Sequence, residues 1–170
     1  MNIVARVNGV EVAKVSGTLE DISLRRNAIM SEAIRIRNSV DLGEIDEVIC
    51  PVKNHFCNGV YIREIQMPKD TFIISKIHKT EYFNEVVSGI CKVVTAETGE
   101  VKTYSAGDIF VSKAGEQKVG YCVTDVIWRT VHVNESNSQD LEEIESRLIA
   151  SSYESLENDQ LIQECKRILL

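Results

Sequence analysis

The sequence predicts a mainly β protein in which one antiparallel barrel or sandwich is flanked by helices. Between residues 59 and 133, short runs of β-branched and aromatic residues alternate with turn residues such as Gly89, Gly99 and Gly107. On both sides of this region, apolar residues recur at the spacing of an amphipathic helix. The chain has 170 residues, of which 44% are hydrophobic, so it can bury one ordinary core and not two full-sized ones.

The N-terminal segment, residues 1–50, predicts a hairpin followed by a helix. Alternating apolar and polar residues at 3–7 and 10–15 flank Asn8-Gly9, a dipeptide that readily adopts the positive φ angles of a type I′ turn. Residues 19–37 have helical spacing, with Thr18 placed to cap the helix and Asp21 in its first turn. We expect this helix to pack over a sheet or against a second subunit.

The central segment, residues 51–134, is rich in predicted strands, and the C-terminal segment, residues 135–170, is helical. The strand segments are 59–66, 71–77, 83–95, 109–112 and 126–133. Acidic helical segments follow at 139–150 and 156–169. The second has an apolar face formed by Leu161, Ile162, Cys165, Ile168 and Leu169. Because this face needs cover from the barrel or from another copy, we expect a homodimer or a larger homo-oligomer.

Charge and cysteine content exclude several classes of protein. The net charge of -7 and the pI near 5.1 disfavour binding to nucleic acid or to an anionic membrane surface. The five cysteines are odd in number and contain no C-x-x-C pair, so the sequence predicts reduced thiols and no thiolate zinc site. No apolar run reaches the roughly 18–20 residues of a membrane span, and the first residues do not resemble a signal peptide. We expect a cytoplasmic protein.

Residues 58–134 resemble the cupin superfamily, and in particular the small single-domain cupins encoded by phages and prophages. The segments that carry the resemblance are Gly59-Val60-Tyr61-Ile62-Arg63-Glu64-Ile65, Met67-Pro68-Lys69-Asp70-Thr71, Lys76-Ile77-His78-Lys79-Thr80-Glu81, Phe110-Val111-Ser112-Lys113-Ala114-Gly115 and Trp128-Arg129-Thr130-Val131-His132-Val133. The resemblance implies a cupin-type antiparallel β-barrel, or jelly roll, over residues 51–134. It also implies that the protein is phage-encoded and would act in the cytoplasm of a host bacterium.

The first cupin motif, G-x5-H-x-H-x3-E-x6-G, aligns with this sequence without a gap. It places Asp70 at the leading glycine, Lys76 and His78 at the two histidines, Tyr82 at the glutamate and Gly89 at the closing glycine. The spacing is therefore retained while two of the three metal-ligand types are replaced.

The second motif, G-x5-P-x-G-x2-H-x3-N, also aligns without a gap. It places Gly107 and Gly115 at its glycines, Lys113 at the proline, Lys118 at the histidine and Cys122 at the asparagine. Of the family's four metal-ligand positions, only His78 keeps a ligand. Charged lysines cannot coordinate a divalent metal and repel it, so we expect no metal and no other cofactor. Glu81, Glu85 and His132 are the nearby residues that could rebuild a metal site.

The replaced positions predict an anion-binding pocket instead. By analogy with the family, Lys76, His78, Tyr82 and Lys118 point into the barrel. Buried lysines require water, an internal carboxylate such as Glu64 or Glu116, or a bound anion. The alternative is that the lysines extend to the rim of the barrel and bind nothing.

Strand alternation adds further candidates, because alternate residues of a strand share a face. Tyr61 and Arg63 share one face of their strand, and Trp128 and His132 share one face of another. If these faces look inward, they supply aromatic surfaces, an imidazole and a guanidinium suited to phosphate or carboxylate. Packing in an ordinary core is the alternative for Tyr61, Trp128 and His132.

Three functions are compatible with these residues. The first is a non-catalytic protein that binds an anionic small molecule, phosphorylated or nucleotide-like, in a basic aromatic pocket; in a phage it could sequester a host signalling nucleotide. The second is a cupin-fold enzyme, an isomerase or epimerase or a metal-dependent oxygenase, that uses His78, Tyr82 and His132. The third is a structural protein whose barrel is filled with side chains.

Overall fold

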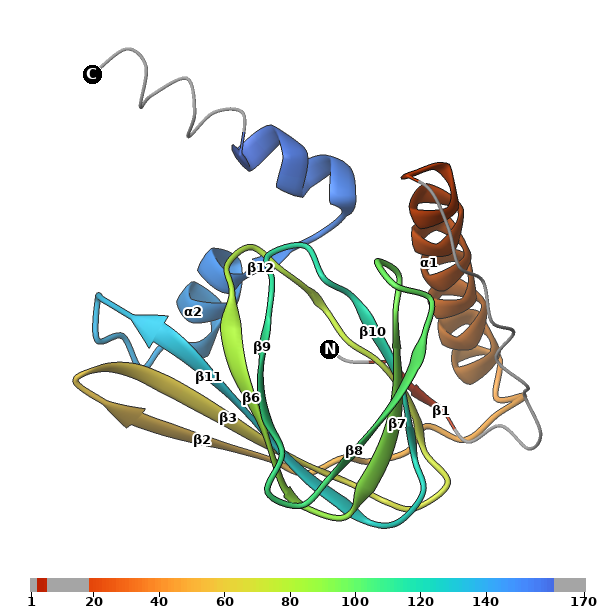
Figure 1. The fold of residues 1–170 in the computed structure, drawn as a ribbon, viewed down its shortest axis with the longest axis horizontal. Helices are drawn as coiled ribbons and strands as arrows, with labels where there is room; N and C mark the ends of the chain where they lie inside the picture. Colours follow the sequence, from red (N-terminus) through yellow and green to blue (C-terminus); the bar gives the residue numbers. More distant parts are fainter. Residues whose placement is uncertain (1–2, 6–18, 161–170) are drawn as a thin grey trace.

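The computed structural model describes residues 3–5 and 19–160, and Figure 1 shows that this part of the chain is mostly β-structure. Two antiparallel sheets face each other and form a barrel. The first sheet has the order β1 (Ile3–Ala5), β4 (Phe72–Ile74), β10 (Lys118–Cys122), β7 (Ile90–Thr95) and β8 (Val101–Ser105). The second has the order β2 (Val52–Cys57), β3 (Gly59–Met67), β11 (Val126–Asn134), β6 (Tyr82–Ser88) and β9 (Ile109–Ser112). A short antiparallel pair joins β5 (Ile77–His78) to β12 (Ile149–Ala150).

The strands agree in part with those that the sequence predicts. The segments 59–66, 109–112 and 126–133 correspond to β3, β9 and β11. The segments 71–77 and 83–95 are each divided in two, the second of them at a turn around Gly89. The prediction missed β2, β8, β10 and β12, which the structure adds to the sheets.

The helix α1 (Leu19–Asp41) confirms the predicted helix and extends it past residue 37. It lies beside the first sheet (Figure 1), where Ala33 and Ile36 pack against Ile74. Arg26 forms an ion pair with Glu97, at 3.2 Å, in the turn between β7 and β8. The helix therefore covers the outer face of that sheet.

The C-terminal helix α2 (Leu141–Leu148) falls within the predicted helical segment 139–150. The Asp140 side chain caps it by accepting hydrogen bonds from the backbone N–H groups of Glu142 and Glu143. Its buried residues Ile144 and Leu148 pack against Tyr61 of β3. Residues 153–160 are helical as well. No helix in the described ranges is long and apolar enough to span a membrane.

Three expectations concern residues outside the described part of the chain. These are the Asn8-Gly9 hairpin, the Thr18 cap and the apolar face of residues 161–169. Of the predicted hairpin, the structure describes only β1, which pairs with β4.

The main core lies between the two sheets. It is formed by Ile65, Met67, Val86, Cys91, Val93, Cys122, Val126 and Trp128. Cys91 and Cys122 are opposite each other on β7 and β10, and both are free thiols. The core does not fill the barrel completely, and the remaining space forms the cavity described next.

Candidate ligand cavity

A cavity of about 340 Å³ lies inside the barrel. All the candidate residues that the sequence predicts contribute to its wall: Tyr61, Arg63, Lys76, His78, Tyr82, Lys118, Trp128 and His132. They come from β3, the start of β5, β6, β10 and β11, and so from both sheets. The structure therefore brings these residues together around one space.

Strand alternation explains why the faces converge. Thr130 of β11 is the partner of Arg63 in β3, and His132 is the partner of Tyr61. Because paired residues in an antiparallel ladder point to the same side of the sheet, both pairs line the cavity. Trp128 lines it too, and its indole packs edge-on against Tyr104 and Phe110 of the core, with ring centroids 6.0 and 5.6 Å away.

The sequence analysis missed the contribution of α2. Leu141, Ile144, Glu145 and Leu148 of this helix line the cavity. The spacing of Ile144 and Leu148, four residues apart, is the signal that marks an inward face. The sequence could not show what this face packs against, because Tyr61 lies more than 80 residues earlier in the chain.

Aromatic and imidazole rings form a stack along one side of the cavity. Phe56 stacks on Tyr61 with centroids 5.4 Å apart, and Tyr61 stacks on His132 at 5.9 Å. His132 in turn stacks on His78 at 5.2 Å and on Tyr82 at 5.0 Å. A flat apolar surface next to polar ring edges is suited to a planar ligand.

The two histidines of this stack are neutral at pH 7. Burial, followed by the charge of neighbouring His132 and Lys118, lowers the pKa of His78 from 6.5 to about 3. Burial and the nearby Arg63 lower the pKa of His132 from 6.5 to about 4. The Nδ1 atoms of both rings are buried without a hydrogen-bond partner in the described structure.

The lysines already have partners. Lys76 forms an ion pair with Glu145 of α2. The ammonium group of Lys118 donates a hydrogen bond of 3.0 Å to the Tyr82 hydroxyl and lies 3.8 Å from a Glu116 carboxylate oxygen. Of the two carboxylates expected to balance the lysines, Glu116 does so. Glu64 does not, because it faces away from the cavity and accepts a hydrogen bond from Arg129, 2.8 Å away.

Arg63 is different from the lysines. Its guanidinium makes no hydrogen bond or ion pair with any residue that the structure describes. Burial is the main cause that lowers its pKa, which means that the charged form is poorly solvated where it lies. Glu145 on the same cavity wall acts on Arg63 electrostatically but is paired with Lys76, so the N–H donors of the Arg63 guanidinium are open to an anion.

The geometry also bears on the metal and enzyme alternatives. No group of three or more His, Cys, Asp or Glu side chains that could hold a metal ion occurs in the described ranges. Glu85, one of the residues considered for rebuilding a metal site, is instead 3.4 Å from Arg129. His78 and Tyr82 meet through tilted rings with centroids 4.0 Å apart, and the Tyr82 hydroxyl accepts its hydrogen bond from Lys118.

Comparison with known proteins gives matches only among solved structures. No protein-family model and no curated protein matches the sequence. An RmlC-like cupin from Methanocaldococcus jannaschii is 14% identical, with a TM-score of 0.43, over 53% of this chain and 84% of that chain. A protein with a double-stranded β-helix domain from Klebsiella pneumoniae is 20% identical, with a TM-score of 0.43, over 53% of this chain and 79% of that chain.

A putative ethanolamine utilization protein Q from Salmonella typhimurium also matches. It is 16% identical, with a TM-score of 0.43, over 51% of this chain and 70% of that chain. At this similarity no function is transferred. The structure itself confirms the predicted mainly β class, an antiparallel barrel with helices on both sides of it in the sequence.

Proposed function

We propose that this protein binds a small organic anion inside the barrel, with Arg63 as the group that recognises the negative charge. The observation that carries the proposal is the unpartnered guanidinium on the cavity wall. A partly buried cation without a hydrogen-bonded counter-charge is costly, and a bound carboxylate or phosphate would remove that cost. The planar fork of a guanidinium can hold either group through two parallel hydrogen bonds.

The rest of the wall sets the other properties of the ligand. Trp128, Ile65, Met67 and Val93 make one part of the cavity apolar, and the rings of Tyr61 and His132 lie beside Arg63 in the sheet. The volume of about 340 Å³ is near the lower end of the range for ligand pockets. We therefore propose a ligand with one acidic group and one flat ring system, of mononucleotide size or smaller.

Sequestration of a nucleotide signal in a host bacterium is the biological role that suits such a ligand. The role requires binding without turnover, and the neutral histidines of the stack support contact more than proton transfer at pH 7. A large dinucleotide is disfavoured by the size of the cavity.

Isothermal titration calorimetry with a panel of small anions tests this function. The panel contains a nucleoside monophosphate, a cyclic mononucleotide, a nucleotide sugar and an aromatic carboxylate. We expect one of them to bind, with an affinity that falls as salt is added. A charge-assisted hydrogen bond contributes roughly 1.5–3 kcal/mol, so Arg63→Gln should weaken binding by about tenfold to a hundredfold.

Arg129→Gln is the matched control, because Arg129 lies on the same sheet but faces away from the cavity and pairs with Glu64. Lys79→Met is a second control, because Lys79 is outside the cavity wall and pairs with Asp159 at 2.8 Å. Thermal melts of each variant show whether it is folded. Binding of no anion by the parent, or an equal loss in Arg63→Gln and Arg129→Gln, would overturn the proposal.

A further inference from the structure

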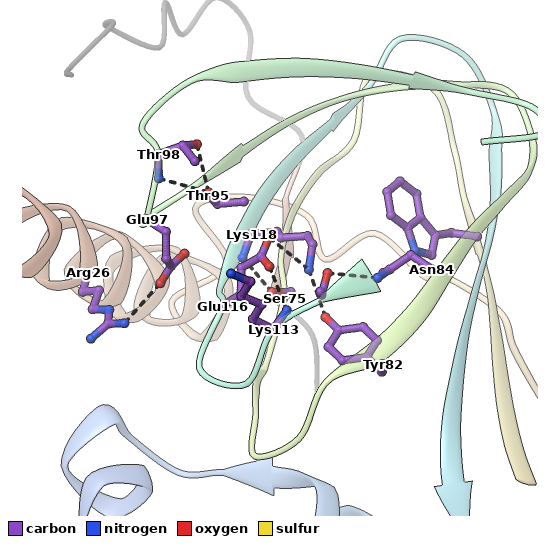
Figure 2. Close-up of polar contacts among 12 residues, drawn as sticks. Arg26, Ser75, Tyr82, Asn84, Thr95, Glu97, Thr98, Lys113, Glu116 and Lys118 are labelled. Atoms are coloured by element: carbon purple, nitrogen blue, oxygen red, sulfur yellow. Dashed lines mark hydrogen bonds and ion pairs between the residues drawn. The ribbon is translucent and has the colours of Figure 1, made fainter. Parts of the chain in front are cut away.

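Lys118 is an amine enclosed in the wall of the cavity. Only 7% of the residue is exposed, and its nitrogen lies between the Tyr82 hydroxyl and the Glu116 carboxylate, as Figure 2 shows. The backbone holds the residue firmly, because β10 pairs with both β4 and β7. The amine is therefore presented to the cavity from the centre of a sheet and not from a loop.

Lys118 loses its proton more readily inside the barrel than a lysine in water does. Burial lowers its pKa from 10.5 to about 8, although the carboxylates of Glu116 and Glu97 act in the opposite direction. The other groups that face it are the Tyr82 hydroxyl and the imidazole of His78. A lysine that loses its proton near neutral pH is a nucleophile, and burial is a known way to obtain one.

We propose that Lys118 forms an imine with a small aldehyde or ketone that also bears a carboxylate or phosphate. The carbonyl end would occupy the space beside Lys118, and the acidic end would pair with Arg63. This second contact rests on the function proposed above, whereas imine formation itself requires only the cavity and the amine. Lys118 and Arg63 line the same cavity, and the charge of each lowers the pKa of His78.

The reaction is balanced without an oxidant or a reductant. The amine nitrogen attacks the carbonyl carbon, and a proton moves from nitrogen to oxygen to give a carbinolamine. The carbon–oxygen bond then breaks, the oxygen takes up a proton and leaves as water, and the nitrogen gives up its second proton, so that a carbon–nitrogen double bond remains. Tyr82 is the nearest hydroxyl, and burial raises its pKa, so it stays protonated and can hydrogen-bond to the departing oxygen.

Lys76 provides an internal comparison. It lines the same cavity, but it is paired directly with Glu145 of α2. Lys76 is hydrogen-bonded directly to that carboxylate, whereas the Glu116 oxygen is 3.8 Å from the Lys118 nitrogen; the tighter contact holds Lys76 in its charged form, which has no free electron pair and is a poor nucleophile. The proposal therefore selects one of the two lysines that the cavity contains.

Reductive trapping tests the proposal on the whole chain. Glyoxylate, which carries an aldehyde and a carboxylate, is incubated with the protein and cyanoborohydride, and the modified lysines are identified by peptide mass mapping. At pH 8 we expect Lys118 to be modified about tenfold faster than Lys76 or Lys79. The rate at Lys118 should reach half its maximum near pH 8, whereas that of an ordinary lysine keeps rising to about pH 10. Slower modification at Lys118 than at Lys79 overturns the proposal.

Two variants separate this inference from the anion-binding function. Lys118→Arg keeps the charge and should abolish the fast modification while the thermal melt remains cooperative. Arg63→Gln should slow trapping of glyoxylate about tenfold but leave trapping of the neutral aldehyde propanal unchanged. Fast trapping of both aldehydes at Lys118 without any effect of Arg63→Gln supports the imine and contradicts the anion site. An anion that binds through Arg63 without trapping at Lys118 contradicts the imine alone.

Discussion

The indole Nε1 of Trp128 donates a hydrogen bond of 3.1 Å to the side-chain oxygen of Asn84, which is itself almost fully buried. The amide nitrogen of Asn84 donates in turn to the Ser112 hydroxyl at 2.9 Å. Asn84 thus connects β11, β6 and β9 through side chains as well as through the backbone. Asn84 is on the same strand as Tyr82, β6, which faces Lys118 of β10 across the barrel (Figure 2).

Asn84→Ala should destabilise the protein by about 3 kcal/mol, because it leaves the Trp128 N–H buried without an acceptor and opens a small cavity. The measurement is urea denaturation followed by circular dichroism. A double-mutant cycle with Trp128→Phe isolates the interaction. If the unfolding free energy lost in the double variant equals the sum of the losses in the two single variants, the side chains are not coupled and the hydrogen bond contributes nothing.

Gly89→Ala should be far more damaging than Gly107→Ala. Both glycines have positive φ, 87° and 95°, so both substitutions carry a backbone strain of about 1–2 kcal/mol. A Cβ at Gly89 would lie 2.1 Å from the backbone oxygen of Asp125, whereas a Cβ at Gly107 would meet no atom within 4 Å. We expect Gly89→Ala to lose at least about 2 kcal/mol more in denaturation. Equal losses would mean that the turn can move away from Asp125.

Stability should fall as the pH is lowered from 7 to 5, because His78 and His132 stay neutral in the folded barrel. Their pKa values in the folded protein, about 3 and about 4, are below the ordinary value of 6.5. The unfolded chain therefore takes up protons that the folded chain does not, once the pH falls below about 6.5. Each histidine should lower the free energy of unfolding by about 2 kcal/mol between pH 7 and pH 5.

Denaturation at a series of pH values measures this slope. His132→Phe keeps a ring in the stack but removes one titrating group. Its loss of unfolding free energy between pH 7 and pH 5 should therefore be smaller than that of the parent by about 2 kcal/mol. His55→Gln is the control, because His55 is exposed on the outer side of β2. A His132→Phe curve parallel to that of the parent would show that His132 titrates normally in the folded state.

Much of the cavity wall was predictable from the sequence because the information is local. Alternation along one strand places Tyr61 with Arg63, and the same rule places Trp128 with His132. The positions of Lys76 and Lys118 followed from the spacing of two motifs. The alternation rule depends on neighbouring residues only, so it holds without knowledge of the rest of the fold, whereas the inward positions of the two lysines were implied by the resemblance to cupins.

The charge state of the wall was not predictable because it depends on distant segments. Lys76 meets Glu145, 69 residues away, only because α2 folds back over the barrel. Among the described residues no carboxylate forms an ion pair with Arg63, because Glu145, which acts on it electrostatically, is paired with Lys76. The missed strands have a different cause: β10 contains Gly120 at its centre, and β2 and β8 are edge strands with mostly exposed side chains.

Exposed apolar side chains on the outer face of the second sheet predict that the protein self-associates. Phe83, Ile109, Val111 and Val133 lie on this face and are exposed, Val133 to 64% and Phe83 to 56%. Phe83 is the partner of Val111 in the ladder, so their side chains form one apolar surface. Surfaces of this kind are typical of subunit interfaces.

A second copy is the partner that the charges on this face favour. Next to the apolar surface, Lys53, Glu64, Arg129 and Glu85 occupy paired positions across four strands, with alternating signs. If two copies pack face to face about a twofold axis parallel to the strands, the order of these four residues is reversed in the second copy. Lys53 of one copy then faces Glu85 of the other, and Glu64 faces Arg129, so the row is complementary to itself.

We expect a homodimer in light scattering at tens of micromolar, and Phe83→Glu should shift it to monomer by burying an unpaired charge on each side of the contact. Leu24→Glu is the matched control, because Leu24 is a large exposed apolar side chain on α1, away from the second sheet. Thermal melts at low concentration verify that both variants fold. A monomeric parent would refute the dimer. Loss of the dimer in Leu24→Glu, with Phe83→Glu unaffected, would move the interface from this sheet to the helix.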